Sequence, residues 1–182
     1  MLKPSDKWTW FYSDSEGYLM LDLGNEMVFR TNLSRNLLVD SAFSNPSFTV
    51  DDASAYQTYK ERVSGLKLPE GRQVELALYC VAANRFHKPV QPKSWFFDHQ
   101  TPQLADKPQE GDIVALMNQF NQGHFIILEA GESASLCALV ELEPFTLNPS
   151  KQLSFGQVIK VMHDRMLDAN HILQFESIAL VG

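Results

Sequence analysis

The chain has 182 residues, of which 45% are hydrophobic and 20% are charged, and these proportions are ordinary for a folded globular protein. Its formal net charge of −7 comes mainly from residues 93–182, which argues against a nucleic-acid partner because phosphate neutralisation dominates such binding. No apolar run approaches the roughly 18 residues that span a bilayer, and the first residues lack the apolar region of a signal peptide. We therefore expect a cytoplasmic protein without a membrane-spanning segment.

Residues 7–33 have the pattern of a three-stranded antiparallel meander. The aromatic residues Trp8, Trp10 and Tyr12 recur at every second position, which is the period of a strand, and leucines alternate in the same way in "YLMLDL". The segments "SDSEG" and "GNE" supply turn residues between these runs. A short helix is then possible in residues 34–38, "SRNLL".

Two stronger helices are predicted in residues 50–65 and 69–86. In the first, Asp51 is the expected N-cap, and Val50 and Ala55 have the spacing of a hydrophobic staple. The second, "PEGRQVELALYCVAANRF", is apolar on all sides in its middle and is therefore expected to be the buried helix. Meander and helices together predict an α+β unit.

After Pro89 and Pro92 the pattern changes to short β-like runs separated by turn residues, which is typical of a small sandwich or barrel. Residues 154–167 suit either a helix or a strand, and we favour the strand. The fold class expected is thus α+β, with an N-terminal domain at 1–90 and a twisted, β-barrel-like domain at 91–182. The β-like runs are 94–98, 112–118, 124–130, 135–140, 144–148 and 171–180.

Signals for chemistry are weak. "GESAS" at 131–135 lacks the closing glycine of a nucleophile elbow and is better explained as a hairpin turn. The neighbours His163 and Asp164 are expected to be a solvated surface pair, and Cys80 and Cys137 to be buried, reduced thiols. There is no phosphate-binding glycine loop and no metal-ligand spacing, so we expect no catalytic residue, metal or cofactor.

A partner-binding surface is the better hypothesis. No acidic residue lies between Glu75 and Asp98, whereas Arg85, Lys88 and Lys93 do. Aromatic residues are also concentrated in the first ninety residues. Most of them should belong to the core, but a unit this small has little interior, so some should line a groove at the surface. The candidates for this groove are Trp8, Trp10, Phe29 and Tyr56. Such a groove would suit a peptide that is both acidic and apolar.

Five blocks of the sequence resemble, in order, the gammaproteobacterial ZapC (Z-ring-associated protein C) family of cell-division proteins. They are "KPSDKWTWFYSDSEGYLMLDLGNEMVFRTNL", "VDDASAY", "ANRFHKPVQPKSWFF", "EAGESASLCALV" and "GQVIKVMHDRM". The resemblance implies a non-enzymatic protein at the division septum that binds FtsZ, promotes association of FtsZ protofilaments, stabilises the Z ring and lowers FtsZ GTPase activity. It also implies two domains, an N-terminal one with a hydrophobic pocket and a C-terminal barrel-like one.

Carried onto this sequence, the resemblance implies a basic and aromatic junction at Lys88, Lys93 and Trp95, and an early apolar strand that includes Leu21. We expect Lys88 and Lys93 to point outward and the Trp95 ring to be buried at the start of a strand. We expect the protein to be a monomer. Its expected ligand is the C-terminal tail of FtsZ, which is both acidic and apolar. Bridging of two protofilaments could use two sites or self-association. The alternative function is a β-barrel module that binds a small ligand or nucleic acid, and an unrecognised hydrolase comes third.

Overall fold

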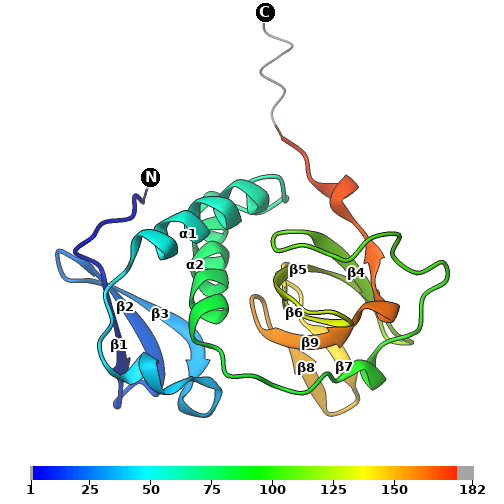
Figure 1. Cartoon of the computed structure of the whole chain (residues 1–182), viewed down its shortest axis with the longest axis horizontal. Coiled ribbons are helices and arrows are strands. Elements are labelled where there is room, and N and C mark those ends of the chain that lie inside the picture. Colours follow the sequence, from blue (N-terminus) through cyan, green and yellow to red (C-terminus); the bar gives the residue numbers. More distant parts are fainter. Residues whose placement is uncertain (1, 176–182) are drawn as a thin grey trace, which may run out of the picture.

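The computed structural model describes residues 2–175 and has the predicted α+β fold (Figure 1). Its first sheet is the predicted meander, with strands in the order β1-β2-β3, all antiparallel. In the β2–β3 turn, Asn25 and Glu26 both have positive φ, the backbone geometry that suits the twist of a tight hairpin. The three strands are β1 (Thr9–Ser13), β2 (Tyr18–Gly24) and β3 (Met27–Ser34).

The first long helix, α1 (Val50–Val63), begins differently from the prediction. Its N-cap is Thr49 and not Asp51: the Thr49 hydroxyl accepts from the Asp52 N–H at 3.1 Å, and the Asp52 carboxylate accepts from the Thr49 N–H at 3.0 Å. This is a capping box. Val50 is 85% exposed, so the predicted hydrophobic staple is wrong. The segment "SRNLL" forms only a 3-10 turn, Arg35–Leu37.

Helix α2 (Glu70–Phe86) is the predicted buried helix. It stands between the first sheet and the second half of the chain, so that side chains on several of its faces are covered (Figure 1). One hydrophobic core joins β1, β2, α1 and α2 to the inner face of the second half, where Ile126, Leu136 and Ala138 belong to the same cluster. A second cluster, built around Phe97, Phe125 and other residues, lies within the second half.

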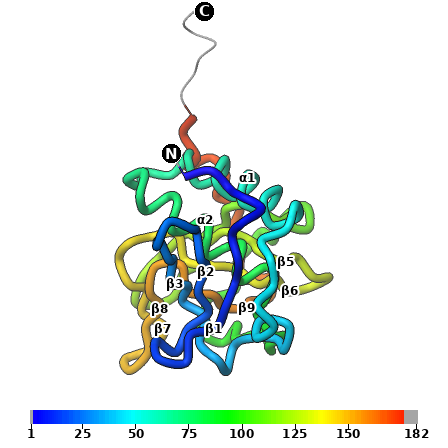
Figure 2. Tube along the Cα trace, turned by 90° about the vertical axis from the view of Figure 1, so that its left-hand side faces the viewer, coloured from blue at the N-terminus to red at the C-terminus, as the bar shows by residue number. Residues whose placement is uncertain are grey.

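The second half contains a five-stranded antiparallel sheet, in the order β10-β4-β5-β6-β9, and a two-stranded hairpin, β7–β8. From the side of the first sheet, this half lies behind β1–β3 (Figure 2). The strands are β4 (Ile113–Met117), β5 (Gln122–Ala130), β6 (Ala134–Leu139), β7 (Phe145–Asn148), β8 (Lys151–Leu153), β9 (Val158–Met162) and β10 (Leu167–Asp168).

Several predicted strands of this half are confirmed, including the strand chosen for 154–167, which is β9, and the "GESAS" turn between β5 and β6. The strand predicted at residues 94–98 is wrong, because Ser94–Phe96 is a 3-10 turn. The run 171–180 was also wrong where it is described, because Asn170–Ile172 is a 3-10 turn, and residues 176–180 lie outside the described residues.

Candidate functional site

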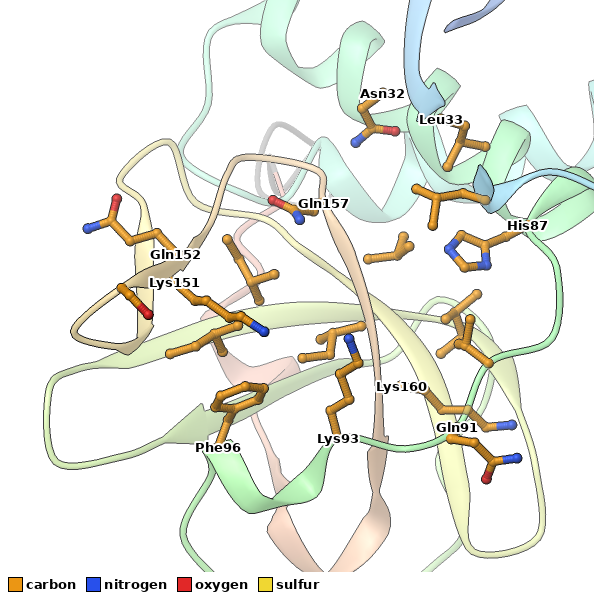
Figure 3. A pocket seen from close by; sticks show the side chains of 18 residues that line it. Asn32, Leu33, His87, Gln91, Lys93, Phe96, Lys151, Gln152, Gln157 and Lys160 are labelled. Atoms are coloured by element: carbon orange, nitrogen blue, oxygen red, sulfur yellow. The ribbon is translucent and has the colours of Figure 1, made fainter. Parts of the chain in front are cut away.

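A cavity of about 450 Å³ lies at the junction of the two halves (Figure 3). We call it the junction cavity. Its walls come from the end of β3, the connection after α2, the β8 strand and β9. Much of its lining is aliphatic: Leu33, Leu37, Val90, Leu136, Leu147, Leu153, Val158 and Ile159.

Three lysines, Lys93, Lys151 and Lys160, also line the junction cavity, and no acidic residue does so within the described part of the chain. The amine ends of Lys93 and Lys151 point toward the middle of the cavity, whereas Lys160 extends along the wall beside Gln91 (Figure 3). The Lys151 amine lies 6.0 Å from the centroid of the Phe96 ring. An aliphatic surface with inward lysines can hold a ligand that carries both carboxylates and apolar groups.

The connection that carries Lys93 is fixed to both halves by backbone hydrogen bonds. The Lys88 N–H donates to the Leu37 carbonyl at 2.8 Å, and the Lys93 N–H donates to the Lys160 carbonyl at 2.8 Å. A β-bridge also pairs Leu38 with His87. These bonds fix the backbone at Lys88 and Lys93, which lowers the entropic cost of binding a ligand there.

Of the basic residues predicted from sequence, Lys93 lines the junction cavity, and Lys88 is exposed nearby but does not line it. Arg85 is different. Its guanidinium donates to the buried Asp52 carboxylate at 2.5 Å and to the Ser47 carbonyl at 2.9 Å. The Arg85 charge is therefore paired within the protein, and Arg85 does not line the junction cavity.

The predicted apolar candidates do not gather at a surface. Trp8, Trp10, Leu21 and Tyr56 are all buried in the shared core, and a ligand could reach them only if that core opened. Phe29 is half-buried and packs against the Tyr79 ring, with 5.4 Å between centroids. These residues therefore contribute to the packing of the first half.

Trp95 corrects a specific expectation. Its ring is 71% exposed and does not enter the core. The cause is local: the Ser94 hydroxyl accepts from the Met162 N–H at 2.8 Å, and Phe97 fills the second core. With residues on both sides anchored inward in a 3-10 turn, the side chain between them projects outward.

Sequence reasoning missed Lys151 and Lys160. Both lie more than fifty residues after Lys93, on β8 and β9, and only the fold brings them to one cavity. The available signal was weak: Lys160 interrupts the apolar run of β9, as a residue directed away from the second core does.

One pair resembles a nucleophile and its base. The Ser135 Oγ lies 2.7 Å from the His163 Nε2, so His163 is not simply a solvated partner of Asp164 as expected. Burial lowers the pKa of His163, and the Lys107 charge lowers it further. However, Ser135 has no exposed surface, so a substrate cannot contact its hydroxyl in this conformation. The geometry gives no support to hydrolysis.

Other chemical candidates are equally limited within residues 2–175. No group of three or more His, Cys, Asp or Glu side chains is placed to hold a metal ion there. Cys80 and Cys137 are buried free thiols, and burial raises the pKa of each, so both stay protonated. No helix in the same range is long and apolar enough to cross a membrane.

These features define an α+β protein in which two sheets, joined by a buried helix, form a basic cavity where they meet. Family models described as cell-division protein ZapC, N-terminal, and cell-division protein ZapC, C-terminal, match residues 1–88 and 89–171. The chain belongs to the ZapC family of cell-division proteins.

Curated relatives agree with this assignment. The chain is 64% identical to the cell division protein ZapC of Vibrio cholerae and 60% identical to that of Vibrio vulnificus, in both cases over the full length of both chains. It is 36% identical to the Proteus mirabilis protein of the same name, over 91% of this chain and 90% of the relative. Membership of this family supports a role in cell division.

Proposed function

We propose that this protein acts in the cytoplasm at the division septum, where it binds FtsZ directly, promotes association of FtsZ protofilaments, stabilises the Z ring and lowers FtsZ GTPase activity. It would do so as a monomer without a cofactor or catalysis of its own. The observation that carries the proposal is the junction cavity, with lysines and no acidic residue among its described lining residues in a chain of net charge −7.

The proposed mechanism is docking of the acidic and apolar FtsZ tail at this cavity. The aliphatic lining would supply most of the affinity by burying apolar side chains of the tail. Lys93 and Lys151 would attract and orient its carboxylates, and Lys88 would add to the positive field from outside the cavity. Such attraction acts over a Debye length of about 8 Å at physiological salt, so binding should weaken as salt rises.

Co-sedimentation with FtsZ polymers tests the proposal. The wild-type protein should pellet with them, and the double variant Lys93→Glu/Lys151→Glu should bind at least roughly tenfold more weakly at low salt, because two attractions become repulsions. Lys88→Glu alone should have a smaller effect. The matched control is Lys3→Glu/Lys7→Glu, which makes the same change in net charge at two exposed lysines outside the cavity.

The control should pellet like the wild type, and thermal melts should show that all variants remain folded. A wild-type protein that stays in the supernatant with FtsZ polymers would refute the proposal. Equal weakening by the control pair would show that net charge matters and the cavity does not.

A small-ligand-binding module is the second candidate, because the junction cavity has a volume in the range of about 300–1,000 Å³ that is usual for such sites. A thermal-shift screen of anionic metabolites distinguishes the two. A metabolite that raises the melting temperature of the wild type but not of Lys93→Glu/Lys151→Glu, together with no pelleting with FtsZ, would favour this function.

A further inference from the structure

Two exposed aromatic side chains border a second cavity next to the junction cavity. Trp95 is 71% exposed and Phe120 is 44% exposed, and both line this second cavity of about 610 Å³. We call the two side chains the aromatic ledge. The cavities share Lys93, Lys151 and two apolar residues, so the ledge continues the lysine-lined surface.

The two turns that carry the aromatic ledge are fixed to one another. The Asn118 amide donates to the carbonyl of Phe96, next to Trp95, at 3.1 Å, and its Oδ1 accepts from the Phe120 N–H at 2.9 Å. The Asp98 N–H also donates to the Met117 carbonyl at 2.8 Å. Because the backbone that carries these two side chains is already fixed, little backbone entropy should be lost when a ligand binds to them.

Stability of the fold does not explain this arrangement. Ser94, which begins the 3-10 turn, and Phe97, which follows it, are buried, whereas the Trp95 side chain between them is 71% exposed. A single exposed apolar residue would need no explanation. Here two exposed aromatic side chains line one cavity together with Lys93 and Lys151, and an exposed apolar surface of this kind marks an interaction site.

We propose that the aromatic ledge binds a large apolar side chain of the same acidic segment whose carboxylates lie against Lys93 and Lys151. This inference rests on the proposed function and identifies the occupant as the FtsZ tail. Charge complementarity supports this choice. Lys93 and Lys151 line both cavities, whereas the only acidic residue in the described lining is Asp98 in the second cavity.

Tryptophan fluorescence gives a direct test, because Trp95 is the exposed one of the three tryptophans, and Trp8 and Trp10 are 3% and 0% exposed. Acrylamide should quench Trp95 selectively. Adding a synthetic peptide of the FtsZ tail should protect it, and the protection should disappear in Trp95→Phe. If the peptide binds but quenching of the wild type is unchanged, the ligand does not cover Trp95 and the inference is wrong.

Affinity supplies the second test, with the same peptide labelled with fluorescein and followed by anisotropy. Trp95→Ala and Phe120→Ala should each weaken binding by roughly 10- to 30-fold, as central aromatic anchors do. Leu142→Ala is the matched control, since Leu142 is 46% exposed and lines a different cavity, and it should bind like the wild type.

The two proposals can fail separately. If the wild type does not sediment with FtsZ polymers, the proposed function itself fails. If the wild type sediments and Lys93→Glu/Lys151→Glu does not, but both alanine variants of the ledge bind like the wild type, the tail docks at the lysines alone. Melting temperatures of the ledge variants should stay close to that of the wild type, because neither side chain fills a core.

Discussion

Asp52 shows how one residue joins local and tertiary structure. Its carboxylate caps α1 through the Thr49 N–H, accepts from the Trp10 indole N–H at 3.1 Å and pairs with Arg85. The side chain is buried, so its charge is stable there only because three donors surround it. A pair of adjacent aspartates in the sequence suggests a helix N-terminus, but it does not indicate which aspartate forms the cap or what else it binds.

Arg85→Ala should therefore lower the free energy of unfolding by about 1.5–3 kcal/mol, the usual contribution of a hydrogen bond to a charged group. Urea denaturation followed by fluorescence measures this, because the buried Trp10 reports directly on the site. Lys88→Ala is the control: Lys88 is exposed and near in sequence, and its removal should change stability by less than about 0.5 kcal/mol. If both variants are equally stable, the Asp52–Arg85 pair does not stabilise the fold.

At the scale of elements, the loop before β9 is held against α2 and β3. Gly156 has a φ of +78°, its carbonyl accepts from the Asn32 amide at 2.8 Å, and a Cβ added to it would lie 2.3 Å from the Tyr79 ring. That ring packs in turn against Phe29 and Phe155. A glycine is needed here for both its backbone conformation and its lack of a side chain.

Gly156→Ala tests this contact, and Gly24→Ala is its control. Gly24 has nearly the same φ of +79°, but an added Cβ would meet nothing within 4 Å, so it reports the backbone strain alone. That strain should cost about 1–2 kcal/mol at either position. Gly156→Ala should cost about 1–3 kcal/mol more, because the Tyr79 ring must move. Equal losses in urea denaturation would mean that the contact is easily relaxed.

An element could be predicted from the sequence when the residues that determine it lie within the element itself. The meander and α2 carry their period and breakers within one segment, and both are confirmed, whereas residues 154–167 suited a helix as well as the favoured strand that became β9. Residues 94–98 also have strand composition, but two hydrogen bonds with β9 impose a turn there: the Lys93 N–H donates to the Lys160 carbonyl, and the Ser94 hydroxyl accepts from the Met162 N–H. Lys93 could be proposed from a run without acidic residues. Lys151, Lys160 and Phe120 could not, because their proximity to it depends on the folding of the second sheet.

At the scale of the whole molecule, the two halves have separate sheets but share a core. We propose that residues 1–90 and 91–182 are two domains that meet near the connection after α2. Ile126 and Leu136 of the second sheet belong to the same buried cluster as Trp10 and Leu76. Polar contacts cross the boundary as well: the Asn84 amide donates to the Leu128 carbonyl at 2.7 Å, and Arg62 donates to the Gly111 carbonyl at 2.8 Å.

This shared core predicts cooperative unfolding. Separating the halves would expose to water the face of α2 that packs against the second half, and the lost burial is worth about 25 cal/mol for each Å² of apolar surface. Neither half should therefore persist alone once the other unfolds. Calorimetry should give one transition whose calorimetric and van't Hoff enthalpies agree, and a fragment of residues 1–88 should lack a cooperative melt. Two resolved transitions, or a stably folded fragment, would show instead that the domains are independent and that the junction cavity lies between parts able to separate.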